Sequence, residues 1–340
     1  MKKLTILLLT LTILSGCFSH RPAKTLEDNP LPSQPIEEEP LLPQLPQPAP
    51  IPVSKTVSSK PSSANESDIV SVSAIPSTPA PDKPVFEDEP AFPLEGRNIS
   101  PLSHFIPEKD ATFAAPWQGE QLKYGIYYSF VKAGTAFIKN RGLVDINGQK
   151  AYVIQTTAFS APVIDTVFKV RDINLSWLDA RNFYSLGYSQ SLREGSYRRD
   201  EWVTFDYKTN TYKGELSKKS GTRAIAGTLT KPVLDMLTSL YFVRSQNLRN
   251  GQDVIFDIIN REEQYPLVVK IVGRETIKTP AGKFKCVVVE PQFRGEGIFV
   301  SKGKNLRVWL TDDDRKMPIK MKTEVFIGSV SAELLEYKHN

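Results

Sequence analysis

The chain has 340 residues, with 43 Lys+Arg against 38 Asp+Glu, 26 Pro, 2 Cys and 3 His. Nineteen of the prolines lie between residues 20 and 110 and seven lie beyond, which excludes a packed domain in that first stretch. We therefore expect a single folded domain over 111–340, a size that is common for one all-β unit.

The first residues are typical of a secretory signal. Lys2 and Lys3 precede an apolar run over 4–14 that is too short to span a bilayer as a helix. The run ends in Leu-Ser-Gly-Cys at 14–17, which resembles the lipobox of bacterial lipoproteins. That resemblance implies a signal peptide over 1–16 and acylation of Cys17, since two or more acyl chains give a durable membrane anchor. The alternative is an ordinary signal peptide with a Cys near its cleavage site.

Localisation follows from the same segment. A lipidated Cys17 predicts a membrane-anchored protein of the bacterial cell envelope. Phe18, rather than Asp, follows the cysteine, so the retention signal known from the inner membrane of enteric bacteria is missing. We expect an outer-membrane lipoprotein that faces the periplasm.

Residues 17–110 are predicted to be a disordered, proline-rich, acidic linker. The part from 20 to 110 carries 7 Lys+Arg and 14 Asp+Glu, and runs such as 43–52 favour polyproline II. Fully extended at roughly 3.1 Å per residue, such a spacer could hold a domain far from its membrane. A docking site for a proline-binding partner is the alternative, and Phe86, Phe92 and Phe105 near its end could pack on the domain.

The folded region is predicted to be mainly β. In 319–327 apolar and charged residues alternate with a period of two, which indicates a strand with one buried face. Turn residues at 145–148, 207–210, 280–282 and 312–315 separate such runs. The regular spacing favours one large curved antiparallel sheet, or a partly closed barrel or roll. The other alternating runs lie at 124–131, 151–159, 183–192, 202–207, 267–272, 284–289 and 306–310.

One segment, 232–247, departs from the period of two. Its apolar residues recur at spacings of three and four, with Asp235 early and Arg244 late. Pro232 suits a first helical turn and the charges suit the helix dipole. We expect one amphipathic helix that packs on the sheet, its apolar stripe serving as core.

Several local patterns in the folded region are similar in order and spacing to a bacterial family known as the domain-of-unknown-function 3108 family. They lie at 119–124, 133–136, 167–177 with Asp172, 205–206, 235–244, 279–284, 309–318 and 327–334. The resemblance implies an exported, β-rich protein with no established activity or ligand. It therefore predicts fold and compartment, and adds almost nothing about chemistry.

The sequence contains no recognisable set of catalytic or metal-binding residues. His20, His104 and His339 all lie outside the domain or at its edge, so a Ser-His-Asp or Cys-His arrangement or a zinc site lacks its histidine. Cys286 lies in an apolar run and is expected to be core. No phosphate-binding or calcium-binding motif is complete, and we expect no cofactor. Only distant carboxylates could serve a hydrolase, and sequence cannot show whether they face each other.

The domain 111–340 is basic, with 34 Lys+Arg against 24 Asp+Glu. Arg193, Arg198, Arg199 and Trp202 are the candidates for a cationic, aromatic binding surface. Outside the cytoplasm such a surface would meet lipid head groups or anionic wall polymers rather than nucleic acid. The alternative is an ordinary soluble surface, because the excess charge is modest.

Three functions remain open. The first is a non-enzymatic module whose curved sheet binds an apolar or amphiphilic envelope molecule, such as a lipid or a lipoprotein. It predicts an apolar cavity lined by alternate strand residues. The second is a structural or assembly protein, tethered across the cell wall to a protein partner. The third is a carboxylate-dependent hydrolase, which requires two facing carboxylates or an acid of raised pKa.

Overall fold

The computed structural model describes residue 86 and residues 96–104, 107–108, 113–260, 262–292, 306–325 and 327–339. The expected signal peptide, the lipidation site Cys17 and most of the proline-rich linker lie outside the described residues. So do Phe92 and Phe105.

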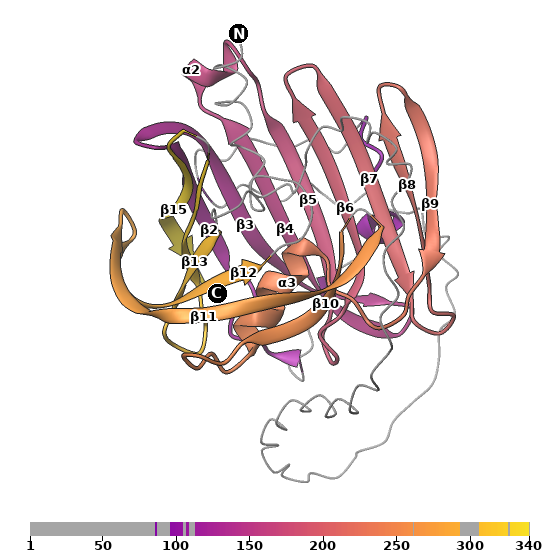
Figure 1. Ribbon diagram of the computed structural model, residues 1–340. Coiled ribbons are helices and arrows are strands. Elements are labelled where there is room, and N and C mark those ends of the chain that lie inside the picture. Colours follow the sequence, from indigo (N-terminus) through magenta and orange to yellow (C-terminus); the bar gives the residue numbers. More distant parts are fainter. Residues whose placement is uncertain are drawn as a thin grey trace, which may run out of the picture. The chain divides into compact units, whose positions relative to one another are not determined.

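One large antiparallel sheet makes up most of the described chain, which confirms the predicted fold class (Figure 1). The strands are β1 (Pro107–Glu108), β2 (Gln121–Tyr128), β3 (Val131–Ile146), β4 (Gln149–Ser160), β5 (Arg171–Asp179), β6 (Ser185–Glu194), β7 (Tyr197–Asp206), β8 (Thr211–Lys218), β9 (Gly221–Thr228), β10 (Val254–Asn260), β11 (Glu263–Thr279), β12 (Gly282–Gln292), β13 (Arg307–Thr311), β14 (Pro318–Glu324) and β15 (Ser329–Lys338). The helical elements are η2 (Pro101–His104), α2 (Pro162–Asp165) and α3 (Met236–Ser245).

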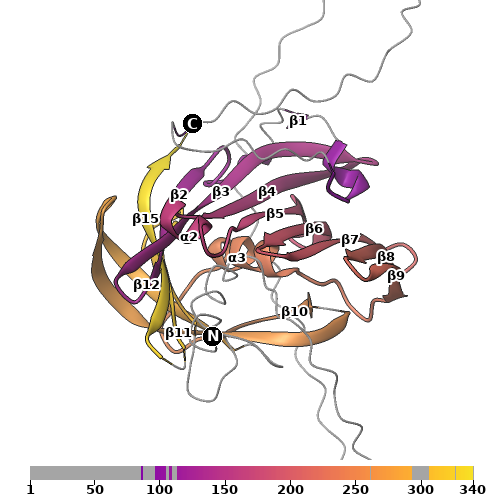
Figure 2. The same ribbon diagram turned by 90° about the horizontal axis from the view of Figure 1, so that it is seen from above.

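The strand order makes the sheet curl. Strands β2 to β9 follow one another as an up-and-down meander, and β10 to β15 form a second meander whose last strand pairs with β2. The right-handed twist of so many strands curves the sheet. Figure 2 shows β10 and β11 lying opposite β5 and β6, with α3 between them.

The edge strands β9 and β10 do not form a ladder, so the sheet is not closed. The connection from β9 to α3 spans part of the gap. Leu234 forms a parallel bridge with Ile258, and the amide of Leu234 donates to the carbonyl of Asp257 at 2.9 Å. The side chain of Gln264 donates to the carbonyl of Thr228 at 2.6 Å. These contacts hold the two edges together at one end of the sheet.

Most strands were predicted from the alternation of apolar and polar residues, but two strands that are buried on both faces were not. All the alternating runs coincide with strands of the sheet, and the turns at 145–148, 207–210, 280–282 and 312–315 join the expected neighbours. Strands β3 and β5 are covered on both faces for most of their length. Strand β3 shows no clear period of two, whereas β5 alternates polar and apolar residues over 172–177 with both sets buried. Strands β8 and β9 are polar and largely exposed, so their pattern is also weak.

Helix α3 is shorter than the predicted 232–247. Asp235 caps the helix, and its carboxylate accepts hydrogen bonds from the amides of Leu237 and Thr238. The Thr238 hydroxyl in turn accepts from the amide of Asp235, which completes a capping box. Pro232 is therefore not in the first turn, and the residues before Asp235 are extended. The prediction of an amphipathic helix packed on the sheet is otherwise confirmed.

The end of the expected linker packs on the outer, convex face of the sheet. Arg97 donates to the hydroxyl of Ser191 at 2.8 Å and to the carbonyl of Arg171 at 3.1 Å. Phe86 is buried against Phe137, with ring centroids 5.4 Å apart. The folded unit therefore begins before residue 111, because Phe86 and Arg97 pack on the outer face of the sheet.

Candidate functional site

A cavity of about 170 Å³ lies on the inner, concave face, between α3 and the curled sheet, and it is partly open to the surface. Most of its wall is apolar. The apolar lining comes from α3, from β3, β5 and β10 to β14, and from the residue before β13, and comprises Met236, Leu237, Leu240, Val243, Phe256, Ile259, Leu267, Val269, Val289, Pro291, Leu306, Val308, Met321, Ile138 and Leu175. Because side chains alternate along a strand, each strand contributes mainly every second residue. The arrangement agrees with the predicted apolar cavity lined by alternate strand residues.

One end of the cavity is polar. Asn174, Tyr188, Gln190, Arg199 and Glu201 line it from β5, β6 and β7. The Tyr188 hydroxyl donates to Glu201 at 2.7 Å, and the Arg199 guanidinium forms an ion pair with the same carboxylate. Burial and the neighbouring Glu201 raise the pKa of Tyr188, which therefore stays protonated and remains a donor. The cavity therefore offers an apolar wall and a polar end, which match the two parts of an amphiphilic molecule.

The N-terminus of α3 is fixed to the sheet by a buried network. The carboxylate of Asp235 accepts from the hydroxyls of Ser176 at 2.8 Å and Ser185 at 2.7 Å, besides the capping bonds from Leu237 and Thr238. Burial raises the pKa of Asp235, although these donors oppose the shift. Since Asp235 also lines the cavity, the network sets the position of the helical wall.

The C-terminus of α3 is held by a buried ion pair. The guanidinium of Arg244 contacts both oxygens of Glu120, at 2.7 and 2.8 Å, and both side chains are almost wholly buried. The same guanidinium lies over the rings of Trp117 and Tyr241, 5.3 and 4.8 Å from their centroids. It also donates to the carbonyl of Arg315. Both ends of the helix are therefore positioned by buried polar contacts.

Two carboxyl groups meet on the inner face near the polar end. Glu194, at the end of β6, hydrogen-bonds to Asp172, at the start of β5, and Asp172 also accepts from the amide of Arg193 at 2.8 Å. Burial, followed by the charge of Asp172, raises the pKa of Glu194 to about 8. The two carboxyls therefore share a proton at neutral pH. Neither residue lines the cavity.

The proton shared by Glu194 and Asp172 should make the stability of the fold depend on pH. An acid whose pKa is higher in the folded state binds a proton that the unfolded chain releases, so the free energy of unfolding falls as pH rises from about 4.5 to 8. Glu194→Gln keeps a donor and does not ionise. We expect it to be more stable than wild type by about 2–5 kcal/mol at pH about 9, and nearly equal at pH about 4, because a pKa change of one unit corresponds to about 1.4 kcal/mol.

Urea denaturation of both proteins at the two pH values measures this difference. Glu336→Gln, which removes an exposed carboxylate, is the control for the loss of a negative charge. The same difference between wild type and Glu194→Gln at both pH values would contradict the shared proton.

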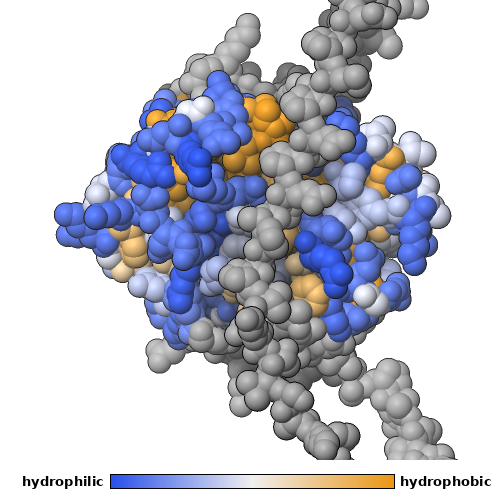
Figure 3. Space-filling view, turned by 90° about the horizontal axis from the view of Figure 1, so that it is seen from below, coloured by the Kyte–Doolittle hydropathy of each residue, from blue (hydrophilic) through white to orange (hydrophobic). Residues whose placement is uncertain are grey.

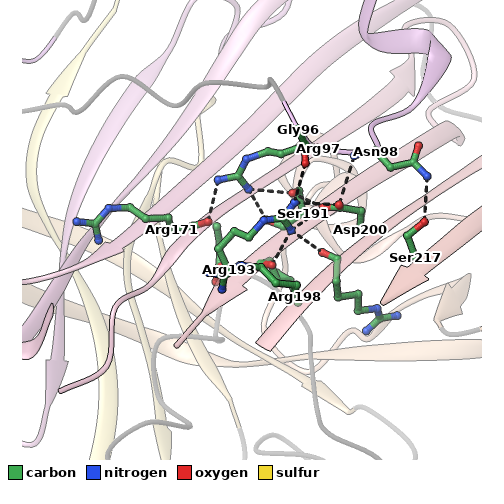
Figure 4. Close-up of polar contacts among 12 residues, drawn as sticks. Gly96, Arg97, Asn98, Arg171, Ser191, Arg193, Arg198, Asp200 and Ser217 are labelled. Carbon is green, nitrogen blue, oxygen red and sulfur yellow. Dashed lines mark hydrogen bonds and ion pairs between the residues drawn. The ribbon is translucent and has the colours of Figure 1, made fainter. Parts of the chain in front are cut away.

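One of the four candidate binding residues, Arg199, is separated from the other three, because β7 places alternate side chains on opposite faces. Arg199 points inward to Glu201 and lines the cavity. Arg193 lies on the outer face and contacts both oxygens of Asp200, at 2.7 and 2.9 Å (Figure 4). Arg198 is exposed at the β6–β7 turn and Trp202 is half-buried on the outer face. The expectation of a single cationic, aromatic patch is corrected accordingly.

Other expectations about chemistry can be placed in the structure. Cys286 is a free, buried thiol whose pKa is raised to about 12 by burial and then by nearby carboxylates. It packs in the core, as expected. No group of three or more His, Cys, Asp or Glu side chains among the described residues could hold a metal ion. Within the described part of the chain, no helix is long and apolar enough to cross a membrane.

Comparison with known proteins identifies the family of the chain. The family model described as "Protein of unknown function (DUF3108)" matches residues 123–335, which include all of the cavity lining. The chain belongs to the DUF3108 family. The resemblance inferred from local patterns is thereby confirmed, and no activity is established for the family. No curated protein matches the chain.

Solved structures that are similar to this DUF3108 protein share little sequence with it. A β-barrel-like DUF1849 protein from Brucella abortus has a TM-score of 0.44 and 8% identity, over 67% of this chain and 100% of that one. A candidate exported protein with a YmcC-like fold from Bacteroides fragilis has a TM-score of 0.30 and 11% identity, over 69% and 99%. A candidate lipoprotein from Parabacteroides distasonis has a TM-score of 0.26 and 8% identity, over 66% and 98%.

Proposed function

We propose that this DUF3108 protein is a non-enzymatic binding module that takes the apolar part of an amphiphilic envelope molecule, a lipid or the acyl chain of a lipoprotein, into its inner cavity. The observation that supports the proposal most directly is the cavity itself, with walls of aliphatic side chains and a polar end at Tyr188, Arg199 and Glu201. Ligand sites are mostly apolar, with a few placed polar groups.

The size of the cavity limits what it can hold. An apolar cavity of about 150 Å³ is known to bind benzene, and the cavity of this protein is about 170 Å³. It therefore holds about six to eight carbons of an alkyl chain. A longer acyl chain would enter by one end, with the remainder outside. The polar end would receive a hydroxyl, ester or amide group rather than an anion, because Glu201 already balances Arg199.

The proposed compartment is the cell envelope. The lipobox at 14–17 and the acidic spacer that follows support a lipoprotein anchored through Cys17 in the outer membrane and facing the periplasm. An envelope lipid or lipoprotein is then the partner within reach of the domain.

Chain-length dependence tests the proposal. The n-alcohols from butanol to decanol should bind residues 18–340 with an affinity that increases about fourfold for each added methylene, because each buried methylene contributes about 0.8 kcal/mol. The increase should stop at about six to eight carbons, when the cavity is full. Isothermal titration calorimetry measures both the slope and the plateau. An affinity that rises steadily to decanol would indicate non-specific surface adsorption and contradict the proposal.

A pair of tryptophan variants provides the control. Leu240 is half-buried in the cavity wall, so Leu240→Trp fills the cavity and should abolish alcohol binding. Ile255 is 55% exposed and is absent from the lining, so Ile255→Trp should bind as wild type does. Equal binding by the two variants would place the alcohols elsewhere. A protein that binds no apolar ligand would favour the tethered structural or assembly protein.

One observation favours the hydrolase as a second candidate. Glu194 has a raised pKa and shares a proton with Asp172, which is the arrangement that acid catalysis requires. We place it second because neither carboxyl lines the cavity, so a substrate held there would not meet them. Loss of turnover in Glu194→Gln, with alcohol binding unchanged, would support the hydrolase.

A further inference from the structure

Exposed apolar side chains gather at one rim of the sheet. Eight large apolar residues among the described ones are well exposed, and five lie in or beside three turns of this rim. Phe130, at the tip of the β2–β3 turn, is 91% exposed, and Val163, in α2 between β4 and β5, is 79% exposed. The five are Phe130, Val131, Val163, Val167 and Ile327. An exposed aromatic ring at a hairpin tip does nothing for the core, so it indicates an interaction surface.

The turns that carry these residues are joined to one another. The amide of Ser129 donates to the carbonyl of Ser329 at 2.7 Å, which links the β2–β3 and β14–β15 turns. The amide of Ala161 donates to the carbonyl of Ala133 at 2.8 Å, which links α2 to the start of β3. In Figure 1, α2 lies at the upper end of the sheet, above the β2–β3 turn. The apolar tips therefore form one surface, which we call the apolar rim.

Basic residues surround the apolar rim. Lys132 follows the β2–β3 turn and Lys169 follows α2, and both are exposed. The neighbouring β6–β7 and β8–β9 turns, at the same end of the sheet, add the exposed Arg198, Lys218 and Lys219. The amide of Gly195 donates to the carbonyl of Lys169 at 2.8 Å, so the β6–β7 turn is continuous with the rim.

The opposite rim has a different chemistry. Its turns are closed by aspartates that accept hydrogen bonds from backbone amides two or three residues later: Asp145, Asp179, Asp206 and Asp313. Figure 3, which views that end, shows a mainly hydrophilic face with scattered apolar patches. The turns of the opposite rim also carry exposed cations, among them Arg181, Lys208 and Arg315. The exposed apolar tips, rather than the charge, therefore distinguish the two ends of the strands.

Part of the described N-terminal segment, 96–104, passes close to the apolar rim. Arg193, two residues before the β6–β7 turn, donates to the carbonyl of Gly96 at 3.5 Å. From Gly96 the chain crosses the outer face, where the amide of Ser100 donates to the hydroxyl of Ser189 and Leu102 lies beside Gly187. Phe86, earlier in the chain, packs on Phe137 with its ring 4.9 Å from the ammonium of Lys338, at the opposite end of the strands.

We propose that the apolar rim binds the surface of a lipid bilayer that contains anionic headgroups. Phe130, Ile327 and Val163 would enter the interface between headgroups and acyl chains, and Lys132, Lys169 and Arg198 would contact phosphates. Apolar insertion and attraction of basic residues to anionic lipid together give interfacial binding. The proposal rests on the rim alone, and it holds whether or not the inner cavity takes a ligand.

Vesicle co-sedimentation tests the proposal. Residues 18–340, without acylation, are mixed with vesicles of phosphatidylethanolamine and phosphatidylglycerol. The double variant Phe130→Ser, Ile327→Ser should lower the partition coefficient about tenfold relative to wild type. The control Ile255→Ser, Val272→Ser removes two side chains that are also exposed, on β10 and β11 away from the rim, and should bind as wild type does. Raised salt, or vesicles without phosphatidylglycerol, should weaken wild-type binding.

Two results would overturn this proposal. Equal partitioning of wild type and the rim variant would show that the rim does not insert. A wild-type dimer in sedimentation velocity that the rim variant abolishes, with no vesicle binding, would assign the rim to a second copy of the chain. Phe130→Trp provides an independent readout, since its fluorescence should shift to shorter wavelength with vesicles only if this tip enters the bilayer. Circular dichroism of each variant checks that the sheet is intact.

Discussion

Replacing Arg244 with leucine is expected to lower the free energy of unfolding by about 3–5 kcal/mol. The substitution leaves the carboxylate of Glu120, which is 1% exposed, without its guanidinium. It also removes the cation that lies over the rings of Trp117 and Tyr241. A buried charge that loses its partner is among the most destabilising changes a core can undergo.

A surface ion pair provides the matched control for Arg244. Arg223 pairs with Glu262, and the two side chains are 54% and 35% exposed. Arg223→Leu should therefore change stability by less than about 1 kcal/mol. Urea denaturation followed by tryptophan fluorescence measures both variants. An Arg244→Leu protein no less stable than Arg223→Leu would show that the buried pair does not hold the helix.

Asp235→Ala is the second large prediction, with an expected loss of about 3 kcal/mol. The change removes the cap of α3, which by itself contributes about 1–2 kcal/mol. It also removes the carboxylate that accepts from the buried hydroxyls of Ser176 and Ser185, and each unsatisfied group adds to the loss. Asp235→Asn retains an acceptor oxygen for the helix amides and should be less destabilising.

Asp206→Ala separates this effect from the simple loss of an aspartate. Asp206 accepts from the amides of Lys208 and Thr209 in an exposed turn, so its removal should be far less damaging. Thermal unfolding at neutral pH compares the three variants. If Asp235→Ala and Asp206→Ala shift the melting temperature equally, the buried network is not what positions α3.

Both predictions concern the wall of the cavity. Asp235 fixes the start of α3 and Arg244 fixes its end, and Leu240, midway between them, faces the cavity. A variant that loosens either end should therefore weaken ligand binding as well as stability. The helix that the sequence pattern indicated as core is, in the folded chain, also part of the candidate site.

Fold class could be predicted from sequence because it depends on local alternation. In β14, Ile319, Met321 and Thr323 are buried while Lys320 and Lys322 are less so, which is the pattern that a one-sided strand produces. Strand β5 reads differently, since Asp172, Asn174 and Ser176 face inward and are nonetheless buried. The polar residues of this strand alternate with apolar ones over 172–177, so a hydropathy pattern would assign its polar face to solvent rather than to the interior. The strand was not among those predicted.

The candidate site could be predicted only in its local parts. Asp235 and Thr238 form the capping box three residues apart, and a closer reading of that spacing would have started the helix correctly. Glu120 and Arg244 are 124 residues apart, and their pairing depends on β15 meeting β2. The carboxyl pair of Asp172 and Glu194 likewise depends on the pairing of β5 with β6. Such contacts follow from strand order, which one sequence does not contain.

The central claim is that the inner cavity holds the apolar part of an envelope amphiphile. Native mass spectrometry of the acylated chain, purified gently from the bacterial envelope and followed by lipid extraction, tests it most directly. We predict a stoichiometric, non-covalent amphiphile on wild type and on Ile255→Trp, and none on Leu240→Trp. A wild-type mass that equals the polypeptide with its covalent acyl chains alone would contradict the claim.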